Sequence, residues 1–125
     1  MKKLFSITML VLFGAAVAFA QESFQLYKFN SQRDAEKVLR ALNAELKLNA
    51  EQYKSVEDLL FKSAQSQVEL YAKEQNKDVH MVEMIVTRNT RHIEGNLQNI
   101  LGEKLYKTYN DKKAAITKAV QTSDK

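Results

Sequence analysis

The sequence predicts an all-α fold, and three observations point to it. The chain of 125 residues contains no proline, and only Gly95 and Gly102 remain after the first twenty residues. Ala, Leu, Lys, Glu and Gln, which favour helices, are abundant. Apolar residues recur at helical spacing through most of the chain. We therefore expect four helices in a helix-hairpin arrangement within one domain.

The first twenty residues predict a secretory signal peptide. Lys2 and Lys3 precede a short apolar run over residues 4–13, and Ala18-Phe19-Ala20 provides a small-x-small cleavage signature. The apolar run is short for a membrane span, and polar residues follow it at once. We expect cleavage after Ala20, export to the periplasm, and no stable membrane insertion of the mature chain.

The remainder divides into an N-terminal arm over 21–30, a helical domain over 31–122 and a frayed tail over 123–125. Loss of Lys2 and Lys3 lowers the formal net charge from +4 to +2. Charges of both signs are interspersed, which indicates a solvated helical surface and disfavours nucleic acid as a partner. There is no cysteine, so neither a disulfide nor a thiolate nucleophile is available.

The helices are placed by their apolar stripes and caps. The first helix begins after Ser31, the second spans about 50–74, the third about 79–101, and the fourth ends near Thr122, with a turn at 75–78. The first stripe contains Ala35, Val38, Leu39, Leu42 and Leu46. The arm contains four large apolar residues, and the sequence leaves open whether it is disordered or packs on a partner: Phe24, Leu26, Tyr27 and Phe29.

The second and third helices carry apolar residues on more than one face. Leu59 and Leu70 lie about 100° from the main stripe of the second helix at roughly 100° per residue. Such split faces leave apolar area for a ligand or a second subunit. We therefore predict a homodimer.

Two helix entries share a weakly repeated motif. Leu48 precedes Asn49, a good N-cap, and Gln52 stands at the third helical position, where it can complete a capping box. Leu101 and Gly102 occupy the matching positions before the fourth helix. The simpler alternative is that these are two unrelated helix starts.

The first copy, over 48–52, resembles the Leu-Thr-x-x-Gln signature of the Spy/CpxP-like family of small periplasmic helical proteins, with Asn49 in place of threonine. The second copy has glycine at the cap, Gly102, and Leu105 where glutamine is expected. The resemblance implies an elongated, antiparallel, cradle-shaped homodimer. It also implies an ATP-independent chaperone or envelope-stress protein that binds unfolded clients on an apolar and basic concave face.

The sequence offers no constellation typical of an enzyme. His80 and His92 are its two histidines, and no phosphate-binding loop, zinc-protease motif or nucleophile elbow is present. We therefore expect no enzymatic activity and no cofactor. His80 and Met84 are four residues apart and are weak candidates for a soft metal ion, although two ligands do not make a site.

The best candidate client-binding surface combines adaptable apolar side chains with arginine. Its candidate residues are Leu59, Leu70, Met81, Met84, Ile85, Arg88 and His92. The competing interpretation places Met81 and Ile85 in a dimer core. Two functional alternatives also remain: a periplasmic metal-binding sensor of the same fold, and a structural interaction protein of the envelope whose aromatic arm docks a membrane component.

Overall fold

The computed structural model describes residues 24–73 and 79–123, which form three helices and no strand. The helices are α2 (Gln32–Leu46), α3 (Ala50–Lys73) and α4 (Val79–Thr122). The all-α prediction is therefore confirmed. The signal peptide with its cleavage site and the predicted turn at 75–78 lie outside the described residues and stay predictions.

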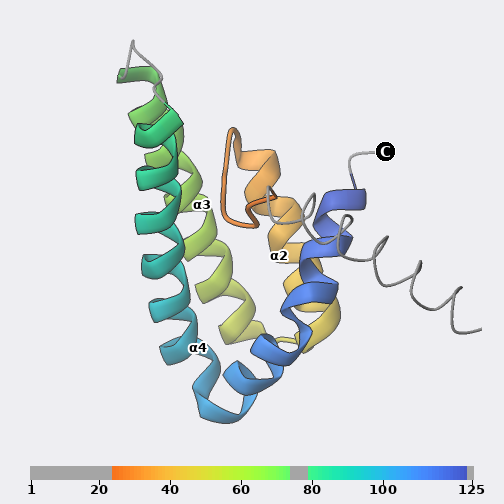
Figure 1. Ribbon diagram of the computed structural model, residues 1–125. Coiled ribbons are helices and arrows are strands. Elements are labelled where there is room, and N and C mark those ends of the chain that lie inside the picture. Colours follow the sequence, from red (N-terminus) through yellow and green to blue (C-terminus); the bar gives the residue numbers. More distant parts are fainter. Residues whose placement is uncertain (1–23, 74–78, 124–125) are drawn as a thin grey trace, which may run out of the picture.

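The helices form a hairpin that packs against a second helical pair. In Figure 1, α3 and the first part of α4 run side by side in opposite directions. The chain then bends sharply, and the second part of α4 returns alongside α2. An ion pair between Lys112 and Glu45, with an N···O distance of 3.4 Å, joins α2 to this returning part.

The sharp bend of α4 is located at one residue, Gly102. Its φ of 81° and ψ of 165° lie inside an otherwise helical run. This combination is essentially restricted to glycine, because a Cβ atom clashes with the backbone there. The prediction of four separate helices is therefore replaced by three, since the last two predicted helices join into α4 across this kink without a loop.

The entry to α3 contains the predicted capping box. The Asn49 side-chain oxygen accepts a hydrogen bond from the Gln52 amide at 2.7 Å, and the Gln52 side-chain oxygen accepts one from the Asn49 amide at 3.2 Å. The Gln52 side-chain nitrogen also donates to the Ile100 carbonyl at 3.5 Å. The first motif copy therefore contacts the chain just before the kink.

The backbone groups at the two ends of α2 are hydrogen-bonded in different ways. Ser31 is the N-cap residue, but its side chain makes no capping hydrogen bond. Instead, the Asp34 carboxylate accepts from the Asn30 amide at 2.7 Å. At the other end Lys47 adopts a left-handed conformation with φ 51°, and its amide donates to the Asn43 carbonyl at 2.8 Å.

The core lies where the hairpin meets α2 and the returning part of α4. All five residues of the stripe predicted for α2 are buried. The helices α3 and α4 contribute Val56, Leu60, Ala64, Ile93, Leu97, Leu101, Tyr109, Ile116 and Val120. Leu48, Leu59 and Ile100 pack against its margin while staying partly exposed.

The N-terminal segment 24–30 belongs to this core. Leu26, Tyr27 and Phe29 are buried, with 8%, 1% and 0% of their surface exposed. A hydrogen bond from the Lys28 amide to the Gln25 carbonyl turns the backbone so that these side chains face inward. In Figure 1 the segment lies between the hairpin and α2. Both alternatives left open by the sequence, a disordered arm and an arm packed on a partner, are thus replaced by packing within the chain.

Candidate functional site

The distal end of the hairpin carries the large apolar side chains that the core does not cover. We call this the hairpin tip and define it as residues 68–73 of α3 and 79–85 of α4. Among the described residues, the exposed large hydrophobic side chains all lie there: Val68, Leu70, Met81 and Met84.

The tip is exposed because the core stops below it. Gln67 is the last buried residue of α3, and Val86 is the first buried residue of α4 for which burial is described. In Figure 1 the hairpin extends beyond α2 and segment 24–30 at this end. A two-helix hairpin cannot bury apolar residues on its outer faces.

A shallow groove of about 500 Å³ runs along the outer face of α4, beginning at the tip. Its lining residues are His80, Glu83, Met84, Thr87, Arg88 and Arg91. Met84 is the most exposed large apolar side chain described, at 57%, and Arg88 lies one turn further along. The groove therefore offers a flexible thioether beside guanidinium groups, a surface suited to apolar ligands with negative charge.

The structure separates the predicted client-binding residues into two groups. Leu70, Met81, Met84 and Arg88 lie on or beside the tip and are exposed, and Ile85 is half-buried there. His92 is exposed one turn beyond Arg88. Leu59 lies eleven residues before Leu70, about 16 Å along the helix at 1.5 Å per residue, and packs against the core margin.

The two weak metal candidates line the same groove. Glu83, one helical turn from His80, lines the groove beside them. No group of three or more His, Cys, Asp or Glu side chains within residues 24–73 and 79–123 is arranged to hold a metal ion.

One functional group that sequence reasoning missed is Gln67. It adjoins Val68, which continues the four-residue spacing of Val56, Leu60 and Ala64. Gln67 is nevertheless fully buried and Val68 is exposed. Its side-chain oxygen accepts from the Phe29 amide at 2.9 Å, and its side-chain nitrogen donates to the Tyr27 carbonyl at 2.8 Å. Tyr71 donates to the same oxygen at 3.2 Å.

A second missed group links segment 24–30 to both parts of α4. The Tyr109 hydroxyl donates to the Glu94 carboxylate at 2.7 Å, so the Tyr27 hydroxyl is the donor in the 2.6 Å bond between the two tyrosines. Lys113 donates to the same Glu94 oxygen at 2.6 Å and lies 5.9 Å from the centre of the Tyr109 ring. Burial is the main cause that raises the pKa of Tyr27 and of Tyr109 well above the usual value of a phenol.

These polar groups fix the conformation that presents the tip. Glu94 lies before the Gly102 kink and Lys113 after it, so their ion pair holds the two parts of α4 at one angle. The only sequence signal for this network was the unusual number of aromatic residues in segment 24–30. Tyr27 and Tyr109 are 82 residues apart, and Tyr109 and Glu94 are 15 residues apart, so these pairs leave no local pattern in the sequence.

Comparisons with protein-family models, curated proteins and solved structures found no match for the chain. Among the described residues, no helix combines the length and apolar character required to cross a bilayer. The geometry of the tip and its groove, together with the resemblance at residues 48–52, therefore provides the basis for a functional proposal.

Proposed function

We propose that this protein is an exported, non-enzymatic helical protein that binds unfolded clients without ATP, as a periplasmic chaperone or envelope-stress protein similar to the Spy/CpxP-like family. The observation that supports the proposal most strongly is the hairpin tip. Its exposed apolar side chains gather at one end of the molecule and continue into a groove with two arginines. Scattered single apolar residues are ordinary on a surface, whereas a cluster of them marks an interaction site.

The tip has the chemistry for weak and reversible binding. Fully burying one such side chain contributes about 1.5–3 kcal/mol, so two or three of them contribute roughly 3–9 kcal/mol before the costs of association. Those costs amount to about 4–15 kcal/mol and offset most of this gain, so the net affinity is low. Low affinity suits a chaperone that must release its client without a source of energy.

The arginines of the groove supply the second part of the mechanism. Arg88 and Arg91 are exposed and stand beside Met84. Positive charge beside an apolar surface accelerates encounters with negatively charged client segments, and apolar contact then sets the lifetime of the complex. Added salt is therefore expected to slow association more than it accelerates dissociation.

The proposal includes a homodimer whose two copies form a cradle. The exposed apolar residues on the tip would be partly covered by a second copy, and the hairpin offers a long lateral surface. Light scattering of the mature protein at micromolar concentration is expected to give twice the monomer mass. A monomer at all concentrations would remove the cradle from the proposal and leave the tip as a single client surface.

The decisive experiment is an aggregation assay on the mature protein without nucleotide. We expect near-stoichiometric protein to slow aggregation of an unfolded client. The variant carrying Met81→Ser, Met84→Ser and Ile85→Ser should lose this protection while keeping its helical circular dichroism.

A matched control places three serines at exposed, uncharged positions away from the tip: Gln98→Ser, Asn99→Ser and Asn110→Ser. This control should protect as the wild type does. Equal protection by all three proteins would locate the client surface elsewhere. Protection that disappears with chelator, together with metal binding lost on His80→Ala, would instead support the metal-sensor alternative.

A further inference from the structure

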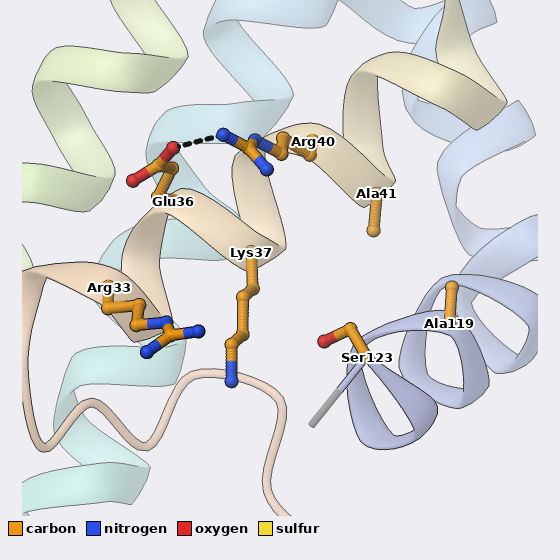
Figure 2. Close-up of a pocket in the computed structure, with 7 residues that line it drawn as sticks. All are labelled: Arg33, Glu36, Lys37, Arg40, Ala41, Ala119 and Ser123. Carbon is orange, nitrogen blue, oxygen red and sulfur yellow. Dashed lines mark hydrogen bonds and ion pairs between the residues drawn. The ribbon is translucent and has the colours of Figure 1, made fainter. Parts of the chain in front are cut away.

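A second hollow lies on the opposite side of the molecule from the hairpin, between α2 and the end of α4. It has a volume of about 500 Å³. Its lining residues are Arg33, Glu36, Lys37, Arg40, Ala41, Ala119 and Ser123 (Figure 2). None of them belongs to the tip or its groove, so the proposed client surface does not use this hollow.

Three of these residues place positive charge on one face of α2. Arg33, Lys37 and Arg40 follow one another at spacings of four and three residues, which puts them on successive turns. Glu36 is the one carboxylate in the lining, and it pairs with Arg40. The lining therefore carries a formal net charge of +2.

The cations also stand near the positive end of the helix. Arg33 lies in the first turn of α2, where the helix dipole favours negative charge, and Asp34 supplies one carboxylate to the same turn. Arg33 and Lys37, four residues apart, carry like charges on one face of the helix. A bound anion is attracted by both cations and by the positive end of the helix together.

The side chains also have suitable directions. Figure 2 shows Arg33 and Lys37 extending to the same side of α2, whereas Arg40 turns toward Glu36. Arg33 is exposed and makes no ion pair within the described part of the chain. The Ser123 hydroxyl lies across the hollow from Lys37 in Figure 2. It donates a hydrogen bond to the Val120 carbonyl at 2.7 Å.

The size and the walls of the hollow indicate that its ligand is larger than a bare ion. A volume of about 500 Å³ falls within the range of small-molecule sites, roughly 300–1,000 Å³. Ala41 and Ala119 form small apolar walls where α2 and α4 approach each other. A guanidinium group matches the geometry of phosphate oxygens, and an ammonium group adds a point charge.

We propose that the hollow between α2 and the end of α4 binds a phosphate group carried on a small organic moiety, with Arg33 and Lys37 as its principal ligands. The phosphate can come from a free phosphorylated compound or from a phospholipid headgroup. The site is independent of the proposed client binding and is tested separately from it.

The test is a titration of the mature protein with inorganic phosphate, at ionic strength held constant with chloride and followed by backbone amide NMR. We expect saturable shifts confined to residues 33–41 and 119–123. Arg33→Gln with Lys37→Gln should weaken binding by about tenfold or more, since two charge-assisted contacts are lost.

A control of equal charge change, Lys104→Gln with Lys107→Gln, removes two exposed lysines from another part of α4. It should leave the phosphate affinity within about twofold, because screening weakens charges that lie beyond a Debye length of about 8–10 Å. A further variant, Ala119→Glu, keeps all three cations and places a carboxylate at the wall of the hollow. It should also abolish binding, and because Ala119 is exposed the fold should tolerate it.

Vesicles distinguish the two sources of phosphate. Binding to phosphatidylglycerol vesicles and not to phosphatidylcholine vesicles, lost in the Arg33/Lys37 variant, would assign the site to anionic headgroups. Saturable binding of free phosphate without vesicle binding would assign it to soluble compounds. Equal weakening in the lysine control, shifts spread over all basic surfaces, or no response to either probe would overturn the proposal.

Discussion

At the scale of single residues, a buried amide stands at the edge of the core, next to the hairpin tip. Gln67 is fully buried and uses both its donor and its acceptor on the main chain of segment 24–30. No buried side-chain polar atom of the described part lacks a partner. Such a group stabilises one arrangement strongly, because any other arrangement leaves polar atoms buried without hydrogen bonds.

Gln67→Ala should therefore lower the free energy of unfolding by about 2–4 kcal/mol, since it leaves the Phe29 amide and the Tyr27 carbonyl buried without partners. Urea denaturation measures the change. Gln65→Ala, two residues earlier and exposed, is the control and should change stability by about 0.5 kcal/mol or less. Equal losses in both variants would contradict the role given to Gln67.

The tyrosine pair predicts a pH dependence of stability. Tyr27 and Tyr109 have pKa values in the folded state that lie above the unfolded value of about 10. Their contribution to the free energy of unfolding is therefore complete below about pH 10. It is lost as the pH rises above this value, because only the unfolded chain releases these protons. The expected slope is about 1.4 kcal/mol per pH unit for each tyrosine.

Urea unfolding at about pH 9, 10 and 11 tests this slope. The variant Tyr27→Phe with Tyr109→Phe should be less stable than the wild type at pH 9, yet should lose less stability on going to pH 11. Tyr53→Phe is the control, because it removes a hydroxyl from a half-buried side chain outside the Tyr27–Tyr109 pair. A wild-type slope retained in the double variant would show that other groups cause the alkaline loss.

At the scale of elements, the kink in α4 determines how the hairpin meets the rest of the chain. One glycine reverses the direction of the helix and brings its second part back to α2. The motif at 48–52 supports this bend through the contact of Gln52 with Ile100. Gly102 occupies the cap position of the second motif copy, and the sequence alone does not show that its φ is positive.

Gly95 and Gly102 should respond to alanine in opposite directions. Gly102→Ala should cost about 1–3 kcal/mol because its φ of 81° and ψ of 165° suit glycine only. Gly95 lies exposed within a helix, and a Cβ atom there meets nothing within 4 Å. Gly95→Ala should therefore stabilise the protein by about 0.5–1 kcal/mol.

Thermal and urea denaturation of both variants measure these effects. Gly102→Asn should also be destabilising, because asparagine tolerates a left-handed helical backbone but not this ψ. If Gly102→Asn were neutral or stabilising, Gly102 would act as an ordinary N-cap, and the kink would need another cause.

At the scale of the whole molecule, segment 24–30 joins the hairpin to the layer formed by α2 and the returning part of α4. Its three buried side chains touch the core, and its polar contacts reach α3 and α4. Burial of side chains of this kind contributes about 1.5–3 kcal/mol each. Their sum is comparable with the total stability of a small domain, about 5–15 kcal/mol.

A chain that begins at Ser31 should therefore lose cooperative unfolding and bind hydrophobic dyes, whereas a chain that begins at Gln21 should fold normally. Circular dichroism and thermal denaturation of the two proteins provide the comparison. A cooperative transition of unchanged midpoint in the shorter chain would mean that segment 24–30 is an accessory and not part of the core.

Features that depend on neighbouring residues could be predicted from the sequence alone. Helical composition and the absence of proline predicted the all-α class, and the spacing of Ala35 to Leu46 predicted the buried face of α2. The pairing of Asn49 with Gln52 predicted the capping box. These features extend over a few residues, where periodicity and hydrogen-bond reach leave a direct trace in the sequence.

Features that depend on contacts between distant segments could be seen only in the folded chain. The place of segment 24–30 in the core, the burial of Gln67 in preference to Val68, and the Tyr27–Tyr109 pair all depend on such contacts. The same is true of the hollow between α2 and the end of α4, whose walls are about 80 residues apart in the chain. Periodicity assigns a side chain to a face of its own helix, but the partner that covers this face is determined by the path of the whole chain.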